Sequence, residues 1–331
     1  MKKIIIALMC AAAFCLSALG LSACGNKTNG SITVYAPDGA PALALARLMS
    51  GETDFVERVS YKIVSSEEIS SSVTYNDESK NADMCILPVN TASKLVGNGQ
   101  SYKMLGTVTH GNLYIVAGKD KPTVTADNAA ETLDGARIGV VNLAGFPGAA
   151  TRLVLKKHGI LNGVTLEGVA ATQVTGTEAQ YDYFVIPEPA ASTRLNNPNL
   201  NLKLAGSLQS LYGENGYPQA VLVAKNSLIE KNSAFISKFM EAMSDSADWL
   251  LDESVTAEAI LNAVKAHYAD PENTKPAFTA AKLTKTVIGN CAIRFEPAAQ
   301  SKQRVKAFLS ELADVNDTAA TAVSDEFFYN A

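Results

Sequence analysis

Four segments of the chain share one pattern, a short apolar run followed by a small or polar loop and then a helical stretch. In the first, the β-branched and aromatic residues of 32–35 predict a strand, Asp38-Gly39 predicts a turn, and the apolar run from Pro41 to Met49 predicts a helix. The other three copies span residues 82–96, 138–157 and 181–191. This alternation predicts an α/β fold that binds ligands at the carboxyl ends of its strands, where helix N-termini present unpaired N–H groups.

The third copy carries the clearest helix signals. Ile138 to Val141 predicts a strand, Pro147 stands at the start of a helix, Lys156 and Lys157 occupy its last turn, and Gly159 ends it. The loop between strand and helix has neither the G-x-G-x-x-G pattern of dinucleotide sites nor the G-K-[ST] ending of a phosphate loop.

Residues at the helix starts admit two interpretations each. Asn90 or Thr91 can cap the following helix, a role compatible with touching a ligand, and Thr125 is a possible cap for a modest helix ending at Leu133. Glu188 can accept a hydrogen bond from a ligand amine or simply interact with the dipole of the helix it precedes.

The middle of the chain predicts a passage between two lobes. Two strand-like runs, 104–108 and 113–117, are separated by a gap too short for a helical crossover. His110 lies in that gap and either touches a ligand or acts as a structural hydrogen-bonding group. The strand candidates 202–208 and 220–224 flank a Gly-rich link containing Tyr217, which we interpret as the return crossing.

The rest of the chain is predicted to be mainly helical. Asn232 or Ser233 can cap a helix that runs to about Leu251, and Thr256 can cap another. Residues 303–312 predict a further helix, and little pattern follows Asp317.

The N-terminus resembles a bacterial lipoprotein signal. Lys2 and Lys3 precede a long apolar run that ends in Ser22-Ala23-Cys24-Gly25. The resemblance implies a signal peptide at 1–23, lipid attachment to Cys24 and a polar tether at 24–30. The alternative is an uncleaved transmembrane anchor, since the apolar run is nearly long enough to span a bilayer. In either case the body lies outside the cytoplasm.

Composition and chemistry narrow the function further. With 331 residues the chain can form two cores, and its net charge of −5 without a basic cluster argues against a nucleic-acid partner. Apart from Cys24, only Cys85 and Cys291 remain in the mature chain as disulfide candidates, although Cys85 also suits a buried apolar strand. The isolated histidines predict no metal site, and no G-x-S-x-G is present. We therefore expect a cleft without a catalytic apparatus, a non-enzyme, and no cofactor.

Five segments together resemble the substrate-binding lipoproteins of ABC transporters, most closely the group of nitrate, sulfonate and thiamine-pyrimidine-precursor binders. These segments are PDGAPALALARLM (37–49), ADMCILPVNTASKL (82–95), IGVVNLAGFPG (138–148), DYFVIPEPAAS (182–192) and GYPQAVLVAKNSLIEKN (216–232). The resemblance implies a type II periplasmic-binding-protein fold, an α/β fold of two lobes with the ligand cleft between them. Lobe 1 would comprise 31–109 and, after the return, the helical 216–331, and lobe 2 would comprise 110–215.

The resemblance also implies a set of site residues drawn from both lobes. They are Asp38, Gly39, Ala40, Asn90, Thr91, His110, Leu143, Ala144, Gly145, Phe146, Glu188 and Tyr217. The cleft loops carry almost no Lys or Arg, so the ligand should be small and neutral or singly anionic, sulfonate-like or heteroaromatic. Tyr35, Phe146, Tyr181 or Tyr217 either stacks on a ligand ring or belongs to the core.

The partners implied by the resemblance are a permease and its ATPase, which would receive the ligand from a monomeric protein anchored in the cell membrane by lipid on Cys24, facing outside the cytoplasm. Two alternatives stay open. Chorismate-processing enzymes of menaquinone synthesis share the fold but are cytoplasmic, and a ligand-sensing surface receptor without its own transporter would look the same in sequence.

Overall fold

The computed structural model describes residues 31–52, 58–177 and 180–330. The predicted signal peptide, tether and lipidation site at Cys24 lie outside these residues. Within them, no helix is long and apolar enough to cross a membrane.

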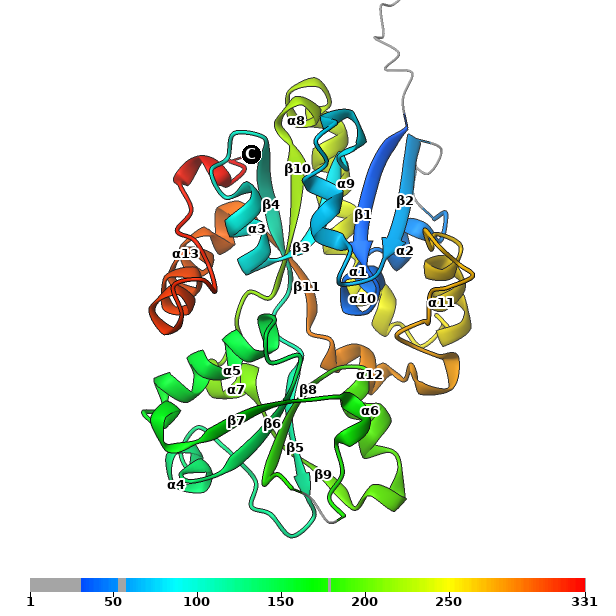
Figure 1. The fold of residues 1–331 in the computed structure, drawn as a ribbon. Coiled ribbons are helices and arrows are strands. Elements are labelled where there is room, and N and C mark those ends of the chain that lie inside the picture. Colours follow the sequence, from blue (N-terminus) through cyan, green and yellow to red (C-terminus); the bar gives the residue numbers. More distant parts are fainter. Residues whose placement is uncertain (1–30, 53–57, 178–179, 331) are drawn as a thin grey trace, which may run out of the picture. The chain divides into compact units, whose positions relative to one another are not determined.

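The first sheet has six strands in the order β11-β4-β10-β3-β1-β2. Their bounds are β1 (Ile32–Pro37), β2 (Val59–Val64), β3 (Met84–Pro88), β4 (Tyr102–Thr109), β10 (Ala220–Lys225) and β11 (Ile293–Pro297). The strands β2, β1 and β3 run parallel, while β10 lies antiparallel between β3 and β4, and β11 is antiparallel to β4. The upper part of Figure 1 shows this sheet.

The second sheet has five strands in the order β7-β6-β8-β5-β9. Their bounds are β5 (Leu113–Gly118), β6 (Arg137–Val141), β7 (Thr165–Val169), β8 (Tyr183–Pro187) and β9 (Leu202–Ser207). Three parallel strands, β7, β6 and β8, are again followed by an antiparallel one, β5, and then by β9. Both sheets thus repeat one arrangement, which confirms the predicted two-lobed α/β fold.

Helices cover both faces of the sheets (Figure 1). Their bounds are α1 (Ala40–Ala44), α2 (Ala46–Met49), α3 (Val89–Val96), α4 (Ala129–Leu133), α5 (Phe146–Lys157), α6 (Ala190–Leu195), α7 (Leu208–Tyr212), α8 (Asn226–Lys231), α9 (Ser233–Ser244), α10 (Ser246–Leu251), α11 (Ala257–Lys265), α12 (Lys285–Asn290) and α13 (Ala298–Val315). Short 3₁₀ turns, such as Ile69–Val73 and Asp325–Phe327, fill several connections.

The predicted helices are present, but the structure places some of their ends and caps at other residues. The predicted helix up to Leu251 is two helices, because Asp245 separates α9 from α10. Thr125 does not cap α4, which begins after Asn128; instead, the Thr125 N–H donates to the side chain of Asn128. Thr256 does cap α11, as its hydroxyl accepts from the N–H of Ala259 at 3.1 Å.

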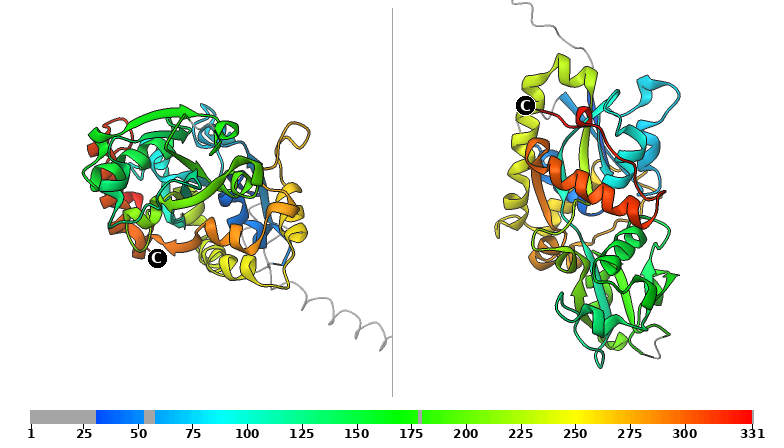
Figure 2. Two further views of the ribbon diagram at one scale, coloured as in Figure 1. Left: turned by 90° about the horizontal axis from the view of Figure 1, so that it is seen from below. Right: turned by 90° about the vertical axis from the view of Figure 1, so that its left-hand side faces the viewer.

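Helix α13 joins the two lobes. It packs against β4 and α3 of the first lobe and against α5 of the second, and the right-hand view of Figure 2 shows it crossing the body between the two sheets. Phe308 of α13 stacks on Tyr217, with ring centroids 5.5 Å apart and ring planes 5° from parallel. Its ring centroid also lies 6.2 Å from that of Phe146. A single hydrophobic cluster therefore extends through both lobes.

Candidate functional site

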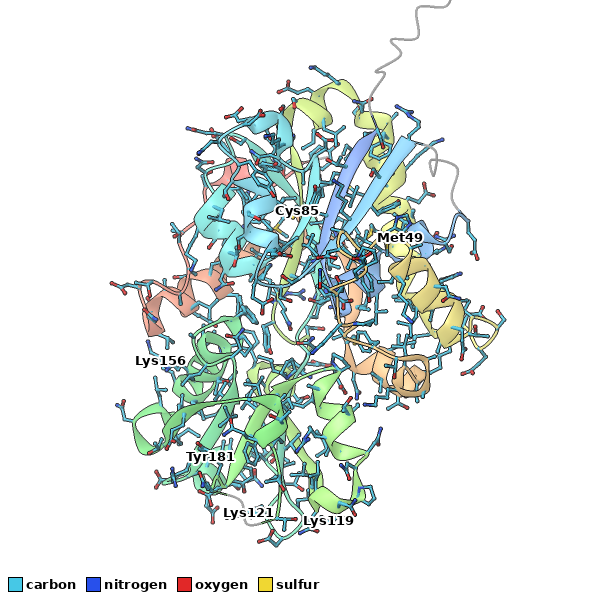
Figure 3. All side chains as sticks on the ribbon, turned by 45° about the vertical axis from the view of Figure 1, so that its right-hand side comes forward. Met49, Cys85, Lys119, Lys121, Lys156 and Tyr181 are labelled. Carbon is cyan, nitrogen blue, oxygen red and sulfur yellow. The ribbon has the colours of Figure 1, made fainter. Side chains whose placement is uncertain are left out.

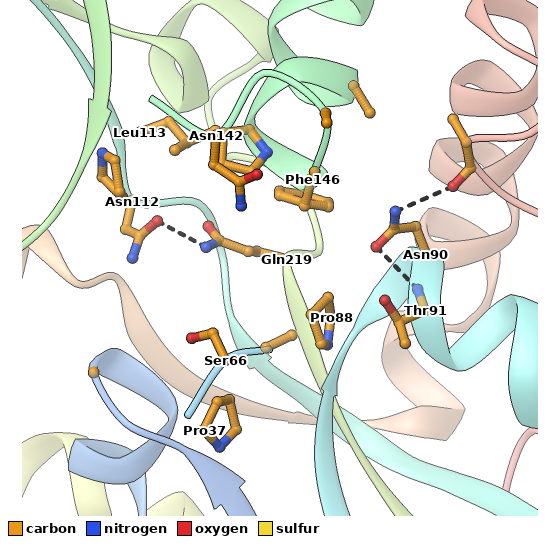
Figure 4. Close-up of a pocket in the computed structure, with 18 of the residues that line it drawn as sticks. Pro37, Ser66, Pro88, Asn90, Thr91, Asn112, Leu113, Asn142, Phe146 and Gln219 are labelled. Atoms are coloured by element: carbon orange, nitrogen blue, oxygen red, sulfur yellow. Dashed lines mark hydrogen bonds between the residues drawn. The ribbon is translucent and has the colours of Figure 1, made fainter. Parts of the chain in front are cut away.

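A cavity of about 570 Å³ lies between the lobes, within the size range of small-molecule sites. Its walls include the loops that follow the carboxyl ends of β1, β3, β6 and β8, which are the four loops of the repeated sequence pattern. Figure 4 shows Pro37, Pro88 and Asn142, from the ends of three of these strands, around one space. The four copies of the pattern thus meet at the place where an α/β sheet presents helix N-termini.

The loop after β1 holds the carboxylate of Asp38 at the cavity wall. Gly39 adopts a φ of 107°, which an L-residue rarely tolerates, and stands as the N-cap of α1. Asp38 accepts hydrogen bonds from the backbone N–H of Gly39 at 2.9 Å and from that of Ala277, far along the chain, at 2.7 Å. Burial raises the pKa of Asp38 above its ordinary value, although these two N–H donors and the Tyr268 hydroxyl act in the opposite direction.

The loop after β3 differs from its prediction. Pro88 is the N-cap of α3, so neither Asn90 nor Thr91 caps the helix; both already lie inside it. The Asn90 side chain accepts from the N–H of Thr91 at 2.9 Å and donates to the carbonyl oxygen of Ala319 at 3.1 Å, as Figure 4 shows. Asn90 therefore ties the cavity wall to the C-terminal segment of the chain.

The loop after β6 is shaped by two backbone requirements. Asn142 has a φ of 60°, in the left-handed region that asparagine tolerates better than most residues. A Cβ on Gly148 would collide with the carbonyl oxygen of Leu143. Residues 143–146 all line the cavity, and Gly145 is the N-cap of α5.

The loop after β8 buries the carboxylate of Glu188, whose side chain is 4% exposed. Glu188 accepts from the N–H of Ser192 at 3.0 Å and from its hydroxyl at 2.6 Å. The Asn290 side chain, at the end of α12, donates a third hydrogen bond at 2.9 Å. These protein donors hold the carboxylate at the cavity wall.

Ten of the twelve predicted site residues line the cavity; the other two, His110 and Tyr217, do not. His110 is buried at the crossing between lobes, where its Nε2 donates to the Arg294 carbonyl oxygen at 2.9 Å and its Nδ1 accepts from Arg304 at 2.8 Å. Burial, followed by the charge of Arg294, lowers the pKa of His110 to about 4. That the ten lining residues bind a ligand is still a prediction.

The aromatic residues proposed for stacking have separate positions. Tyr217 is fully buried in the core shared by the lobes, whereas Phe146 reaches the cavity although only 9% of it is exposed. Tyr181 lies toward the far end of the second lobe (Figure 3), where Arg137 stacks over its ring. Tyr35 has Lys62 over its ring and does not line the cavity.

Several polar side chains of the cavity were not among the predicted site residues. Lys94 and Arg152 line it from helices α3 and α5, whereas the prediction of few cations was made for the cleft loops alone. Helical spacing could have revealed them, since each lies within two turns of a predicted loop residue. Gln219 donates to Asn112 across the two crossings at 2.7 Å (Figure 4), while its own Oε1 is buried without a partner among the described residues.

The described residues contain no cluster of His, Cys, Asp and Glu that could hold a metal ion. Cys85, in the interior of the first lobe (Figure 3), and Cys291 are both buried free thiols in different hydrophobic clusters. Burial raises the pKa of both thiols, which makes them poor nucleophiles.

The sequence matches no protein-family model and no curated protein. Solved structures do resemble the chain. A protein described as an ABC transporter from Parabacteroides distasonis is 19% identical, with a TM-score of 0.70 over 91% of this chain and 99% of that one. The periplasmic aliphatic sulphonate-binding protein SsuA from Escherichia coli is 13% identical, with a TM-score of 0.59 over 91% and 94% of the two chains.

The chain has the two-lobed fold of the periplasmic binding proteins. This agrees with the resemblance drawn from the sequence. A similar structure is also known for an enzyme, DszB. A mutant of DszB in complex with biphenyl-2-sulfinic acid is 14% identical to this chain, with a TM-score of 0.52 over 89% of this chain and 98% of that one. Most of the similar structures are transport binding proteins.

Proposed function

We propose that this protein is the extracytoplasmic solute-binding lipoprotein of an ABC importer. It captures a small organic molecule by closure of its lobes and delivers it to a permease whose ATPase drives import. The observation that carries the proposal is the cavity of about 570 Å³ between the lobes, lined by all four strand-to-helix loops. A cavity divided between two bodies can close on its ligand by a hinge motion, which is how such folds couple binding to a change of shape.

The ligand is a neutral or singly anionic molecule, sulfonate-like or heteroaromatic. Helix α5 begins at the cavity loop, since its N-cap Gly145 lines the cavity, and Arg152 adds a guanidinium suited to a sulfonate or carboxylate. Phe146 supplies an apolar ring at the same wall. We assign ligand contact to the ten predicted residues that line this cavity.

The lobes are assigned to residues 31–109 and 216–331 for lobe 1 and to 110–215 for lobe 2. Cleavage before Cys24 and lipid attachment to that cysteine anchor the protein on the outer face of the cell membrane, and the protein acts as a monomer. Labelled palmitate tests this part: it should enter the wild-type protein and not a Cys24→Ala variant, which should also leave the membrane. Equal labelling or equal membrane retention of the two would refute the anchor.

A thermal-shift screen of the domain that follows Cys24 tests the binding function. The panel contains sulfonates, nitrate, pyrimidines, flavins and amino acids, and a true ligand raises the melting temperature as its concentration rises. Ala144→Trp, which fills the cavity from its exposed wall, should abolish the shift. Ala130→Trp, at an exposed position of α4 away from the cavity, should retain it. If both variants shift like the wild type, the ligand binds elsewhere and the proposal fails.

A further inference from the structure

The two carboxylates of the cavity have no cationic partner among the residues that the structure describes. Asp38 and Glu188 receive hydrogen bonds only from neutral donors, and among the described residues no Lys, Arg or His lies within 4.0 Å of either as an ion pair. A carboxylate taken out of water is costly unless an opposite charge approaches it. Glu188 is already almost fully buried, and closure of the lobes would remove more water from Asp38.

The two cations of the cavity, Lys94 and Arg152, likewise have no carboxylate partner within the described parts of the chain. Lys94 donates to the carbonyl oxygen of Thr318 at 3.2 Å, and Arg152 donates to that of Gly148 at 3.3 Å. Neither forms an ion pair with a carboxylate in the part of the chain that the structure describes. Both therefore keep donors available for an anionic group.

The opposite charges lie at different ends of the cavity. Asp38 and Glu188 are both hydrogen-bonded to the segment 277–290, through Ala277 and Asn290. Lys94 is instead hydrogen-bonded to Thr318 in the C-terminal segment. Arg152 belongs to α5, which packs against α13. Figure 1 shows α1, α6 and α12 on one side of the body and α3, α5 and α13 on the other. The cavity is thus acidic at one end and basic at the other.

We propose that the ligand is a dipolar molecule, with an ammonium group between Asp38 and Glu188 and a sulfonate or carboxylate group at Arg152 and Lys94. This assignment rests on the solute-binding function proposed above and narrows its ligand class to zwitterions, which are neutral overall. A plain sulfonate would pair with Arg152 and Lys94 at the basic end and leave the carboxylates of Asp38 and Glu188 at the other end without an opposite charge. An ammonium group has three donors and no acceptor, which matches an end that offers carboxylate oxygens.

Calorimetric titration with three compounds that share a butyl chain tests the assignment. These are aminobutanesulfonate, butanesulfonate and butylamine, with the shorter and longer aminoalkanesulfonates added to match the length of the cavity. We expect the best aminoalkanesulfonate to bind about tenfold or more tightly than the alkanesulfonate of the same length, and the alkylamine to bind weakest. Equal or tighter binding of the plain sulfonate would overturn the assignment.

Charge-neutral variants separate the two ends. Glu188→Gln and Asp38→Asn should each weaken the aminosulfonate about tenfold and leave the plain sulfonate unchanged or tighter, whereas Arg152→Gln should weaken both. Glu131→Gln, at an exposed position of α4 away from the cavity, is the matched control and should change neither affinity. Equal losses for both compounds in the Glu188 and Asp38 variants would mean that these residues only support the structure, and would overturn the assignment.

The two sets of compounds also distinguish the dipolar assignment from the solute-binding function on which it rests. If no aminoalkanesulfonate or amino acid binds while another compound of the thermal-shift panel does, the dipolar assignment is overturned and the solute-binding function stands. If no compound of either set binds, both are overturned.

Discussion

Acidification should destabilise the protein through His110. The imidazole is 5% exposed, and its Nδ1 accepts from Arg304, while Nε2 donates to a backbone carbonyl. Protonation would place a third positive charge beside Arg294 and Arg304. Glu296 lies 3.9 Å from Nε2 of His110, but its carboxylate is already paired with Arg304. The pKa of His110 is accordingly lowered from 6.5 to about 4.

The direction and size of the effect follow from linkage. Because the folded pKa is lower than the unfolded one, the unfolded chain binds more protons between these two values. The stabilisation is complete above pH 6.5 and is lost as the pH falls toward 4. With these two pKa values, neutral His110 accounts for about 2 kcal/mol of unfolding free energy that is present at pH 7 and absent at pH 5.

Urea unfolding of the wild type and of His110→Gln at pH 7 and pH 5 measures this contribution. The variant keeps one donor and one acceptor at the site but does not titrate, and the other histidines, His158 and His267, are common to both proteins. We expect the wild type to lose about 2 kcal/mol more than the variant between the two pH values. Parallel losses in the two proteins would refute the reasoning, because they would assign the pH dependence to other groups.

Substitutions at three further positions test the packing and the helix cap described above, each by urea unfolding at neutral pH. Phe308→Ala should cost about 3–5 kcal/mol, since it removes a fully buried ring from the cluster shared by the lobes, and Phe308→Leu should cost much less. Thr107→Val should stabilise the protein by about 1 kcal/mol, because the buried Thr107 hydroxyl has no partner among the described residues; a loss of stability would show that it does have one. Thr256→Ala should cost about 1 kcal/mol through loss of the cap of α11, and an unchanged stability would mean that the cap contributes nothing.

The sequence predicted the four strand-loop-helix units well because their signals are local. An apolar strand, a glycine or proline in the loop and a helical stripe lie within about twenty residues, and the parallel sheet then brings the four loops together. The same reasoning did not find β7 or β11, whose short sequences TLEGV and IRFEP lack a continuous apolar run. Both strands lie at sheet edges, where partial exposure weakens the pattern.

The polar partners of the site could not be predicted because they come from remote parts of the chain. Ala277 bonds Asp38 across 239 residues, and Asn290 bonds Glu188 across 102. No local pattern encodes such contacts. The cations Lys94 and Arg152 lie inside α3 and α5, one or two turns beyond the loops, where the sequence alone does not distinguish a cavity-facing residue from a solvent-facing one.

The place of β10 in the first sheet bears on the order in which the lobes can assemble. All strands of the second sheet lie between residues 113 and 207, so that sheet is complete once this stretch has been synthesised. The first sheet has β3 and β4 early in the chain, but the strand that pairs with both of them is β10, at residues 220–225. During synthesis from the N-terminus, the lobe that begins first therefore closes last, and its two halves wait with unpaired edges while the other lobe is made.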